Sequence, residues 1–294
     1  MPIERRLKSL TKTGLRQLGI EISIYRRDRT ARPIDHRPRS SVSSTRAGKP
    51  RLVLLHHQAA TGGTLISAML ASHPQVRLLS EIHPDYLANG GFSPSTPVDQ
   101  YQRHFGPLPS DLAQAAFRDQ ITHLTRAAAA DGCILIVRDH AHRDVMKHPD
   151  RPVDHVLRDA LGRIAESSLL TVRHPLDSYL SAGRDWLSAL PDLDAYAERY
   201  LGFLGAYPAS SIYRYEDLVA DPKALFRNLT SELRLSRLAF DPSKLRPDTL
   251  SGNSGRSGPA ISLRRRRRVP RSLRKQLAGD KYRLLCTRLG YDPE

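Results

Sequence analysis

The fold is decided by residues 51–73, RLVLLHHQAATGGTLISAMLASH. This stretch begins with an unbroken apolar run, passes through a pair of glycines and continues in a helical pattern. A continuous apolar run that ends at a turn is typical of a parallel strand buried on both faces. The turn between such a strand and the following helix is a frequent phosphate site, because the first amides of the helix and its dipole both favour an anion.

The rest of the chain alternates between strand and helix patterns. Further strands are predicted at 76–81, 133–140, 167–174 and 210–218, and helices at 64–73, 110–130 and 221–233. Pro175 suits the first position of a helix after the strand at 167–174. Strands that alternate with helices indicate an α/β fold with a mainly parallel sheet.

The positive charge of the chain is concentrated in two segments. The formal net charge is +16, and residues 1–51 hold 14 Lys or Arg against 4 Asp or Glu. Residues 256–275 hold 9 Lys or Arg and no acidic residue. Such local basicity indicates two anionic contact sites rather than a generally cationic protein.

Residues 1–48 are predicted to be a basic leader and linker, and residues 49–294 one domain. Leucines near helical spacing open the leader, and an Arg-, Pro- and Ser-rich stretch closes it. Two interpretations of the leader stay open, an amphipathic helix that contacts anionic membrane through residues 1–25 and a disordered tail. The N-terminus has no apolar segment of the secretory kind, and no apolar run is long enough to span a membrane.

The two cysteines, Cys133 and Cys286, have no metal-binding spacing and lie in apolar patterns. We expect both to be reduced core thiols, which indicates a reducing compartment. The predicted location is therefore cytoplasmic, with membrane association through the leader as the open addition. The sequence does not indicate an oligomeric state.

The glycine loop differs from the ATP-binding pattern G-x-x-x-x-G-K-[ST]. His57 takes the place of the first Gly, and Gly63 takes the place of the Lys that contacts the β- and γ-phosphates. Only Gly62 and Thr64 match. This argues against an ATPase or GTPase.

Three later segments carry a more specific signal. TVRHPLDSYLSA (171–182) has a predicted strand end at Arg173 and a serine eight residues later. RYEDLVADP (214–222) follows the last predicted strand, and SGNSGRSGPAISLRRRRRVP (251–270) joins a Gly- and Ser-rich loop to an arginine run. In this order, and together with the glycine loop, these segments resemble the sulfotransferases that use 3′-phosphoadenosine 5′-phosphosulfate (PAPS), over roughly residues 51–294.

The resemblance implies a fold and a set of cofactor-binding residues. The fold is a three-layer sandwich with a central, mainly parallel sheet, like that of the P-loop nucleoside triphosphate hydrolases. ATGGT (60–64) is similar to the family's [KR]-S-G-T-T loop, which cradles the 5′-phosphosulfate. The residues implied for PAPS are Thr61, Gly62, Gly63 and Thr64 in this loop, Arg173 and Ser181 at the 3′-phosphate, Tyr215 near the adenine, and Arg256 in the late loop.

The resemblance also implies a catalytic pair. The family's K-x-H strand end corresponds to Arg138–Asp139–His140, so His140 is the implied base and Arg138 the cation that steadies the developing charge. His142 is the reserve candidate for the base. The family's basic loop residue is Ala60 in this chain, and its aromatic residue after the loop is Leu65. Another cation must then stabilise the leaving group, with Arg138, His57 and the arginines at 264–268 as candidates.

The expected reaction transfers a sulfuryl group from PAPS to a hydroxyl acceptor without a metal. A carbohydrate or glycolipid hydroxyl is the expected acceptor, and residues 83–130 are the expected place for its pocket or lid. A metal hydrolase built on histidines such as His56 and His57 lacks a carboxylate or Cys to complete its ligands. The remaining alternative is a non-catalytic protein that binds nucleic acid or another polyanion through its arginine-rich segments, although no aromatic residues for stacking on bases lie near them, so nucleic acid is not the expected partner.

Overall fold

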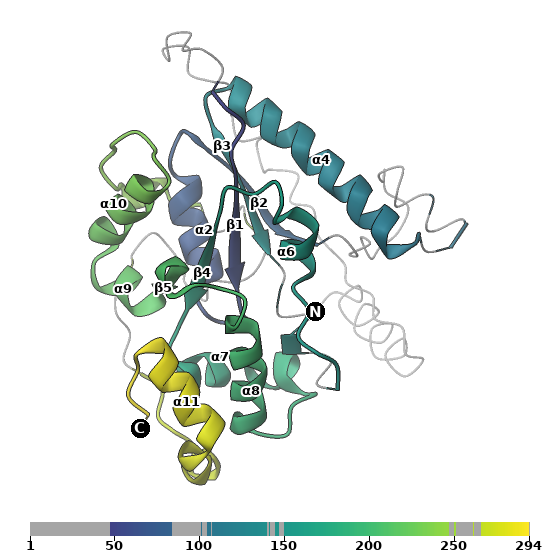
Figure 1. Ribbon diagram of the computed structural model, residues 1–294. Helices are drawn as coiled ribbons and strands as arrows, with labels where there is room; N and C mark the ends of the chain where they lie inside the picture. The colour runs from purple at the N-terminus through teal and green to yellow at the C-terminus, as the bar shows by residue number, and fades with distance from the viewer. Residues whose placement is uncertain are drawn as a thin grey trace, which may run out of the picture. The chain divides into compact units, whose positions relative to one another are not determined.

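The computed structural model describes residues 48–83, 101, 105–106, 108–139, 141, 145–146, 150–246, 250, 261 and 266–293. A five-stranded parallel sheet forms its centre, in the order β2-β3-β1-β4-β5 (Figure 1). The strands are β1 (Leu52–His57), β2 (Val76–Ile82), β3 (Ile134–Asp139), β4 (Ser167–Val172) and β5 (Ile212–Arg214). The predicted parallel sheet is confirmed.

The helices cover both faces of this sheet. They are α2 (Gly63–Ala71), α4 (Ser110–Ala130), α6 (Val156–Leu161), α7 (Pro175–Leu187), α8 (Leu193–Leu204), α9 (Tyr215–Ala220), α10 (Pro222–Glu232) and α11 (Asp280–Leu289). Short 3-10 turns lie at Ala209–Ser211, Pro242–Lys244 and Arg271–Ala278. The predicted helices at 64–73, 110–130 and 221–233 correspond to α2, α4 and α10, and Pro175 opens α7 as predicted.

The alternation of side chains along β1 and β3 builds the layers. Val53 and Leu55 of β1 pack with α2, α9 and α10 on one face. Leu52 and Leu54 pack with α4 and α6 on the other. Since successive side chains of a strand point to opposite faces, the unbroken apolar run of β1 is what a strand between two helical layers requires. The three-layer α/β sandwich is confirmed.

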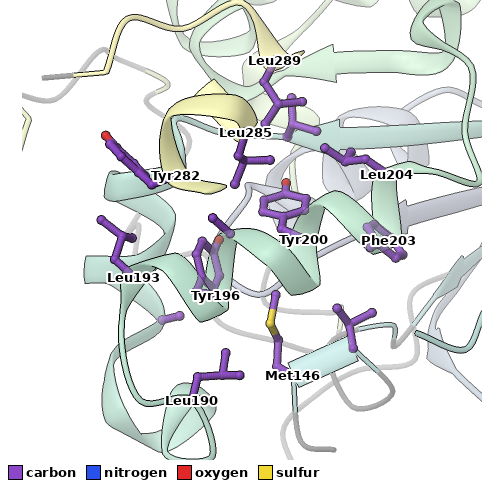
Figure 2. Close-up of a cluster of buried hydrophobic side chains, with 14 of the residues drawn as sticks. Met146, Leu190, Leu193, Tyr196, Tyr200, Phe203, Leu204, Tyr282, Leu285 and Leu289 are labelled. Atoms are coloured by element: carbon purple, nitrogen blue, oxygen red, sulfur yellow. The ribbon is translucent and has the colours of Figure 1, made fainter. Parts of the chain in front are cut away.

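A third buried cluster lies beyond the carboxyl ends of the strands. There α8 packs against α11, with aromatic and aliphatic side chains interleaved (Figure 2). Tyr196, Tyr200 and Phe203 of α8 and Leu285 of α11 belong to this cluster. This cluster supports α7, which begins directly after β4.

The last predicted strand was too long. Within 210–218 only Ile212–Arg214 is β-strand, and α9 begins at Tyr215. Glu216 and Asp217 lie in the first turn of α9, where acidic side chains stabilise the positive end of a helix. Tyr215 therefore lies at a helix start rather than within a strand.

Some predictions concern residues outside the described ranges or find only partial tests there. Outside the described ranges lie residues 1–47 of the leader and the loop at 84–100. The same holds for His140, His142 and Arg256. Both cysteines are buried and free, as predicted. Within the described part of the chain, no helix is both long and apolar enough to cross a membrane.

Candidate active site

The loop between β1 and α2 is shaped by two residues with left-handed backbone. Gly62 has φ 90° and Ala60 has φ 63°. Among the described residues, no side chain caps the start of α2 at Gly62. The first amides of a helix have no partner within it, so those of α2 can meet an anion at the carboxyl edge of the sheet.

The two loop glycines each make room for a different ring. A Cβ on Gly62 would lie 2.5 Å from Cδ2 of Tyr215, and a Cβ on Gly63 would lie 2.5 Å from Cγ of His57. Close packing therefore favours glycine at both positions, and the left-handed turn also favours it at Gly62. The contact also brings Tyr215, predicted near the adenine, onto the predicted phosphate loop.

Thr61 and Thr64 have different surroundings. The Thr61 hydroxyl is buried, donates to the Gln58 carbonyl at 2.8 Å and lies 3.5 Å from the Thr171 hydroxyl. The Thr61 side chain thus stabilises the turn of the loop by a hydrogen bond within it. The Thr64 hydroxyl instead accepts a hydrogen bond from Arg138 at 3.2 Å.

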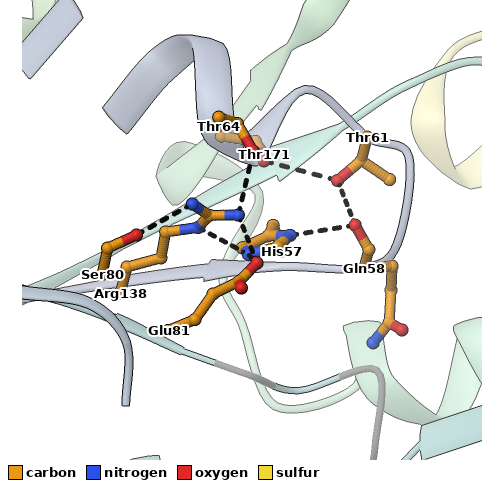
Figure 3. A network of polar contacts seen from close by, with 8 residues as sticks. All are labelled: His57, Gln58, Thr61, Thr64, Ser80, Glu81, Arg138 and Thr171. Carbon is orange, nitrogen blue, oxygen red and sulfur yellow. Dashed lines mark hydrogen bonds and ion pairs between the residues drawn. The ribbon is translucent and has the colours of Figure 1, made fainter. Parts of the chain in front are cut away.

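Arg138, near the end of β3, is 1% exposed and lies at the centre of a polar network (Figure 3). Its Nε–H donates to His57 Nε2 at 2.9 Å, and Nη1 donates to the Ser80 hydroxyl at 3.1 Å. Its Nη2 donates to Thr64 and also to Glu81 Oε1, at 2.6 Å. The guanidinium is thus held by four side chains from three elements of the sheet edge.

The network fixes the state of His57. A guanidinium can only donate, so His57 Nε2 accepts and the ring proton lies on Nδ1. Nδ1–H donates to the Gln58 carbonyl at 3.0 Å. His57 is therefore a neutral ring in this network. It does not supply the positive charge for which it was a candidate in stabilising a leaving group.

The electrostatics of the network centre on the ion pair between Arg138 and Glu81. Burial lowers the pKa of the Arg138 guanidinium, and the Glu81 carboxylate opposes this shift. Glu81 has φ 51° and lies where the pairing of β2 with β3 shifts register between Leu79 and Ile82. This irregularity was not visible in the sequence, and neither was the partner it gives to Arg138.

Arg173 and Tyr215 form the second part of the candidate site. The Arg173 guanidinium carbon lies 4.8 Å from the centroid of the Tyr215 ring, and Nη1 donates to the Ala60 carbonyl at 3.4 Å. Arg173 directly follows β4, and Tyr215 opens α9 next to β5. Arg173 and Tyr215, which are more than 40 positions apart in the chain, thus both contact the loop at one edge of the sheet.

Ser181 lies half-buried in the second turn of α7. The described part of the arginine run lies along the same helix. Arg266 pairs with Asp177 at 2.9 Å, and Arg267 donates to the Leu180 carbonyl at 2.8 Å. Two arginines of the run are therefore engaged by α7.

A second buried pair lies at this edge of the sheet and was not predicted from the sequence. His56 Nδ1 lies 2.7 Å from Asp139 Oδ2, and both side chains are buried. The His56 ring also packs on Tyr207, with centroids 4.8 Å apart. Adjacent residues of β1 thus face opposite ways, His57 toward Arg138 and His56 toward Asp139.

The described residues contain no group of three or more His, Cys, Asp or Glu side chains placed to hold a metal ion. The candidate site is instead a set of backbone amides, hydroxyls and two arginines, Arg138 and Arg173. Groups of this kind bind phosphate or sulfate oxygens.

No protein-family model matches the chain, and no curated protein gives a significant match. Among solved structures, the chain is similar to the sulfotransferase domain from the curacin biosynthetic pathway, with 17% sequence identity and a TM-score of 0.49. That alignment covers 84% of this chain and 100% of the domain. The chain is also similar to the sulfotransferase domain from the Synechococcus PCC 7002 olefin synthase, with 18% identity, a TM-score of 0.46, and 85% of this chain and 98% of that one covered.

Proposed function

We propose that this protein transfers a sulfuryl group from PAPS to a hydroxyl acceptor. One observation carries the proposal. The Tyr215 ring packs on Gly62 of the loop and under Arg173, so that three sequence segments implied by the sulfotransferase resemblance meet at one place. PAPS has two separate anionic groups and a flat base, and this place offers an amide-lined loop, an arginine and an aromatic ring.

The loop residues suit the 5′-phosphosulfate. The first amides of α2 and the Thr64 hydroxyl are its proposed donors. Because Thr64 Oγ1 accepts from Arg138, its single hydrogen is directed away from Arg138 and is available to a bound oxygen. Arg173 with Ser181 is proposed for the 3′-phosphate, since a guanidinium fork matches phosphate oxygens.

The proposed chemistry is an in-line displacement. PAPS supplies an activated sulfuryl group: the acceptor oxygen bonds to sulfur, the bond from sulfur to the phosphate oxygen breaks, and the acceptor proton passes to a base. His140 is the proposed base, and a histidine is suited to this role near neutral pH. Arg138 acts in this scheme through Thr64 and the loop, because its guanidinium is engaged by protein side chains.

The polyanion-binding alternative has weaker support. Arg266 and Arg267 both bond to α7, which leaves less of the run to meet a separate polymer. The proposed acceptor is a carbohydrate or glycolipid hydroxyl. A panel of glycans and glycolipids with labelled PAPS identifies it by label transfer.

The test of the cofactor site is calorimetric titration with PAP, the desulfated product. We expect Arg173→Ala to abolish detectable PAP binding, because it removes the proposed 3′-phosphate ligand and the cation on Tyr215. The exposed Arg163→Ala is the matched control and should bind like the wild type. His140→Ala should bind PAP normally and lose sulfuryl transfer. Equal PAP affinity in the wild type and Arg173→Ala would refute the proposed function.

A further inference from the structure

The Glu216 carboxylate makes two hydrogen bonds next to the Arg173–Tyr215 pair. Glu216 Oε1 accepts a hydrogen bond from the backbone N–H of His174 at 3.1 Å. Its other oxygen, Oε2, accepts from the Tyr291 hydroxyl at 2.5 Å. His174 follows Arg173 in the chain and Glu216 follows Tyr215, so this carboxylate joins the two positions next to the stacked pair.

The residues Gly290–Asp292, here called the strap, follow α11 and reach this carboxylate. The Arg214 guanidinium lies over the Tyr291 ring, 4.9 Å from its centroid. The Tyr291 and His174 rings are 5.1 Å apart, and His174 Nε2 donates to the Asp292 carbonyl at 3.2 Å. Four contacts, namely two hydrogen bonds, a cation–π contact and a ring contact, therefore hold the strap beside the ends of β4 and β5.

The chain turns into the strap at Gly290, whose backbone conformation favours glycine. Gly290 ends α11 with φ +67°, a left-handed conformation that favours glycine. A Cβ at this position would also collide with the Arg214 guanidinium. Position 290 thus combines the backbone and the space that bring Tyr291 to Glu216.

The Tyr291 phenol is held in the protonated form that donates to Glu216. Burial and the nearby Glu216 carboxylate raise the pKa of the Tyr291 phenol. The phenol therefore stays protonated and remains a donor. A donor of this kind, bonded to a carboxylate, makes one of the stronger hydrogen bonds in proteins.

We propose that the strap positions the nucleotide site, with Tyr291 and Glu216 holding Arg173 and Tyr215 in their stacked arrangement. Neither is proposed to touch the ligand; both act through their neighbours, as residues that support ligating groups do in other sites. This inference rests on the proposed function for the identity of the ligand. It adds two positioning residues that the resemblance did not supply.

The test uses the full chain and two variants, Tyr291→Phe and Glu216→Gln. Tyr291→Phe keeps the ring and removes only the hydroxyl. We expect its dissociation constant for PAP, measured by calorimetry, to rise roughly three- to tenfold, the change that follows from losing one orienting hydrogen bond. Hydrogen exchange at the His174 amide should also accelerate in both variants, because the strap no longer fixes its acceptor.

The control is an exposed carboxylate. Glu198→Gln makes at the surface the same change as Glu216→Gln and should bind PAP like the wild type. Circular dichroism checks that each variant is folded. If Glu216→Gln does not fold, Tyr291→Phe alone decides the outcome.

The outcomes separate this inference from the proposed function. Wild-type PAP affinity in the variants overturns the positioning role while leaving the proposed function intact. If the wild type itself does not bind PAP, the proposed function fails and the ligand part of this inference fails with it. Exchange at the His174 amide then decides the remaining part: acceleration in Tyr291→Phe supports the strap, and unchanged exchange overturns it.

Discussion

Two residues with left-handed backbone, Ala60 and Gly62, shape the loop between β1 and α2. Gly62 adopts its left-handed conformation without steric cost, whereas Ala60 does so against a penalty of about 1–2 kcal/mol. Strained residues of this kind are concentrated at binding and catalytic sites. The strain at Ala60 is offset by its surroundings, which include the bond from Arg173 to its carbonyl.

Gly62→Ala should damage the loop in two ways. The new side chain adds about 1–2 kcal/mol of backbone strain. It also meets the Tyr215 ring at 2.5 Å, and such overpacking costs a further ~1–3 kcal/mol. We expect a lower free energy of unfolding in urea and weaker PAP binding, since Tyr215 must move.

The matched control for this substitution is Gly106→Ala. Gly106 has φ +94°, close to that of Gly62, but a Cβ there meets nothing within 4 Å. It therefore carries the same kind of strain without the collision. An equal loss of stability in the two variants would show that the Tyr215 contact contributes nothing.

At the scale of elements, the polar network depends on how β2 ends against β3. The register shift between Leu79 and Ile82 turns Ser80 and Glu81 onto Arg138 of the neighbouring strand. A regular strand would send alternate side chains to opposite faces, so these two adjacent residues could not both reach one guanidinium. The bulge is therefore what allows a fully buried arginine to sit next to the loop.

Glu81→Gln should destabilise the protein strongly. It leaves the buried Arg138 charge without its carboxylate partner, and breaking a buried ion pair on one side costs about 3–5 kcal/mol. The loss should appear as a lower midpoint in urea unfolding. Thr64 should also lose its fixed orientation, so PAP binding weakens in the fraction that remains folded.

Glu166→Gln provides the comparison for Glu81→Gln. Glu166 pairs with Arg51 and Arg234 at the surface, where ion pairs are worth ~0–1 kcal/mol. We expect little change in its unfolding curve. A similarly small effect in Glu81→Gln would contradict the view that Arg138 depends on this carboxylate.

Across the whole molecule, the sequence predicted the strands with unbroken apolar runs and missed features that depend on contacts between distant residues. β1, β3 and β4 were recognisable because a strand buried on both faces carries neighbouring apolar residues. Arg173, which follows β4, was predicted from the resemblance and its eight-residue spacing to Ser181. The partners of Arg138 were not predicted. Glu81 lies 57 positions earlier in the chain and reaches Arg138 where the register of β2 shifts against β3.

The same limit explains the remaining differences. β5 ends at Arg214 because α9 begins at the next residue. Glu216 and Asp217 favour the first turn of this helix, but their presence alone did not distinguish a helix start from a continuing strand. Local pattern therefore located the residues of the candidate site, and tertiary contacts decided the direction in which each one points.

The domain boundary near residue 49 makes a prediction about the whole chain. Residues 48–50 are exposed, and the sheet begins at Leu52, so deletion of residues 1–48 should leave the layers of the sandwich complete. It removes 12 Lys or Arg and 4 Asp or Glu. We expect an unchanged circular dichroism spectrum and unfolding midpoint, unchanged PAP affinity, and a reduced affinity for anionic vesicles, since surface attraction scales with the number of basic residues. Loss of folding on deletion would place part of the leader within the domain, and wild-type vesicle binding would assign membrane contact to the arginine run.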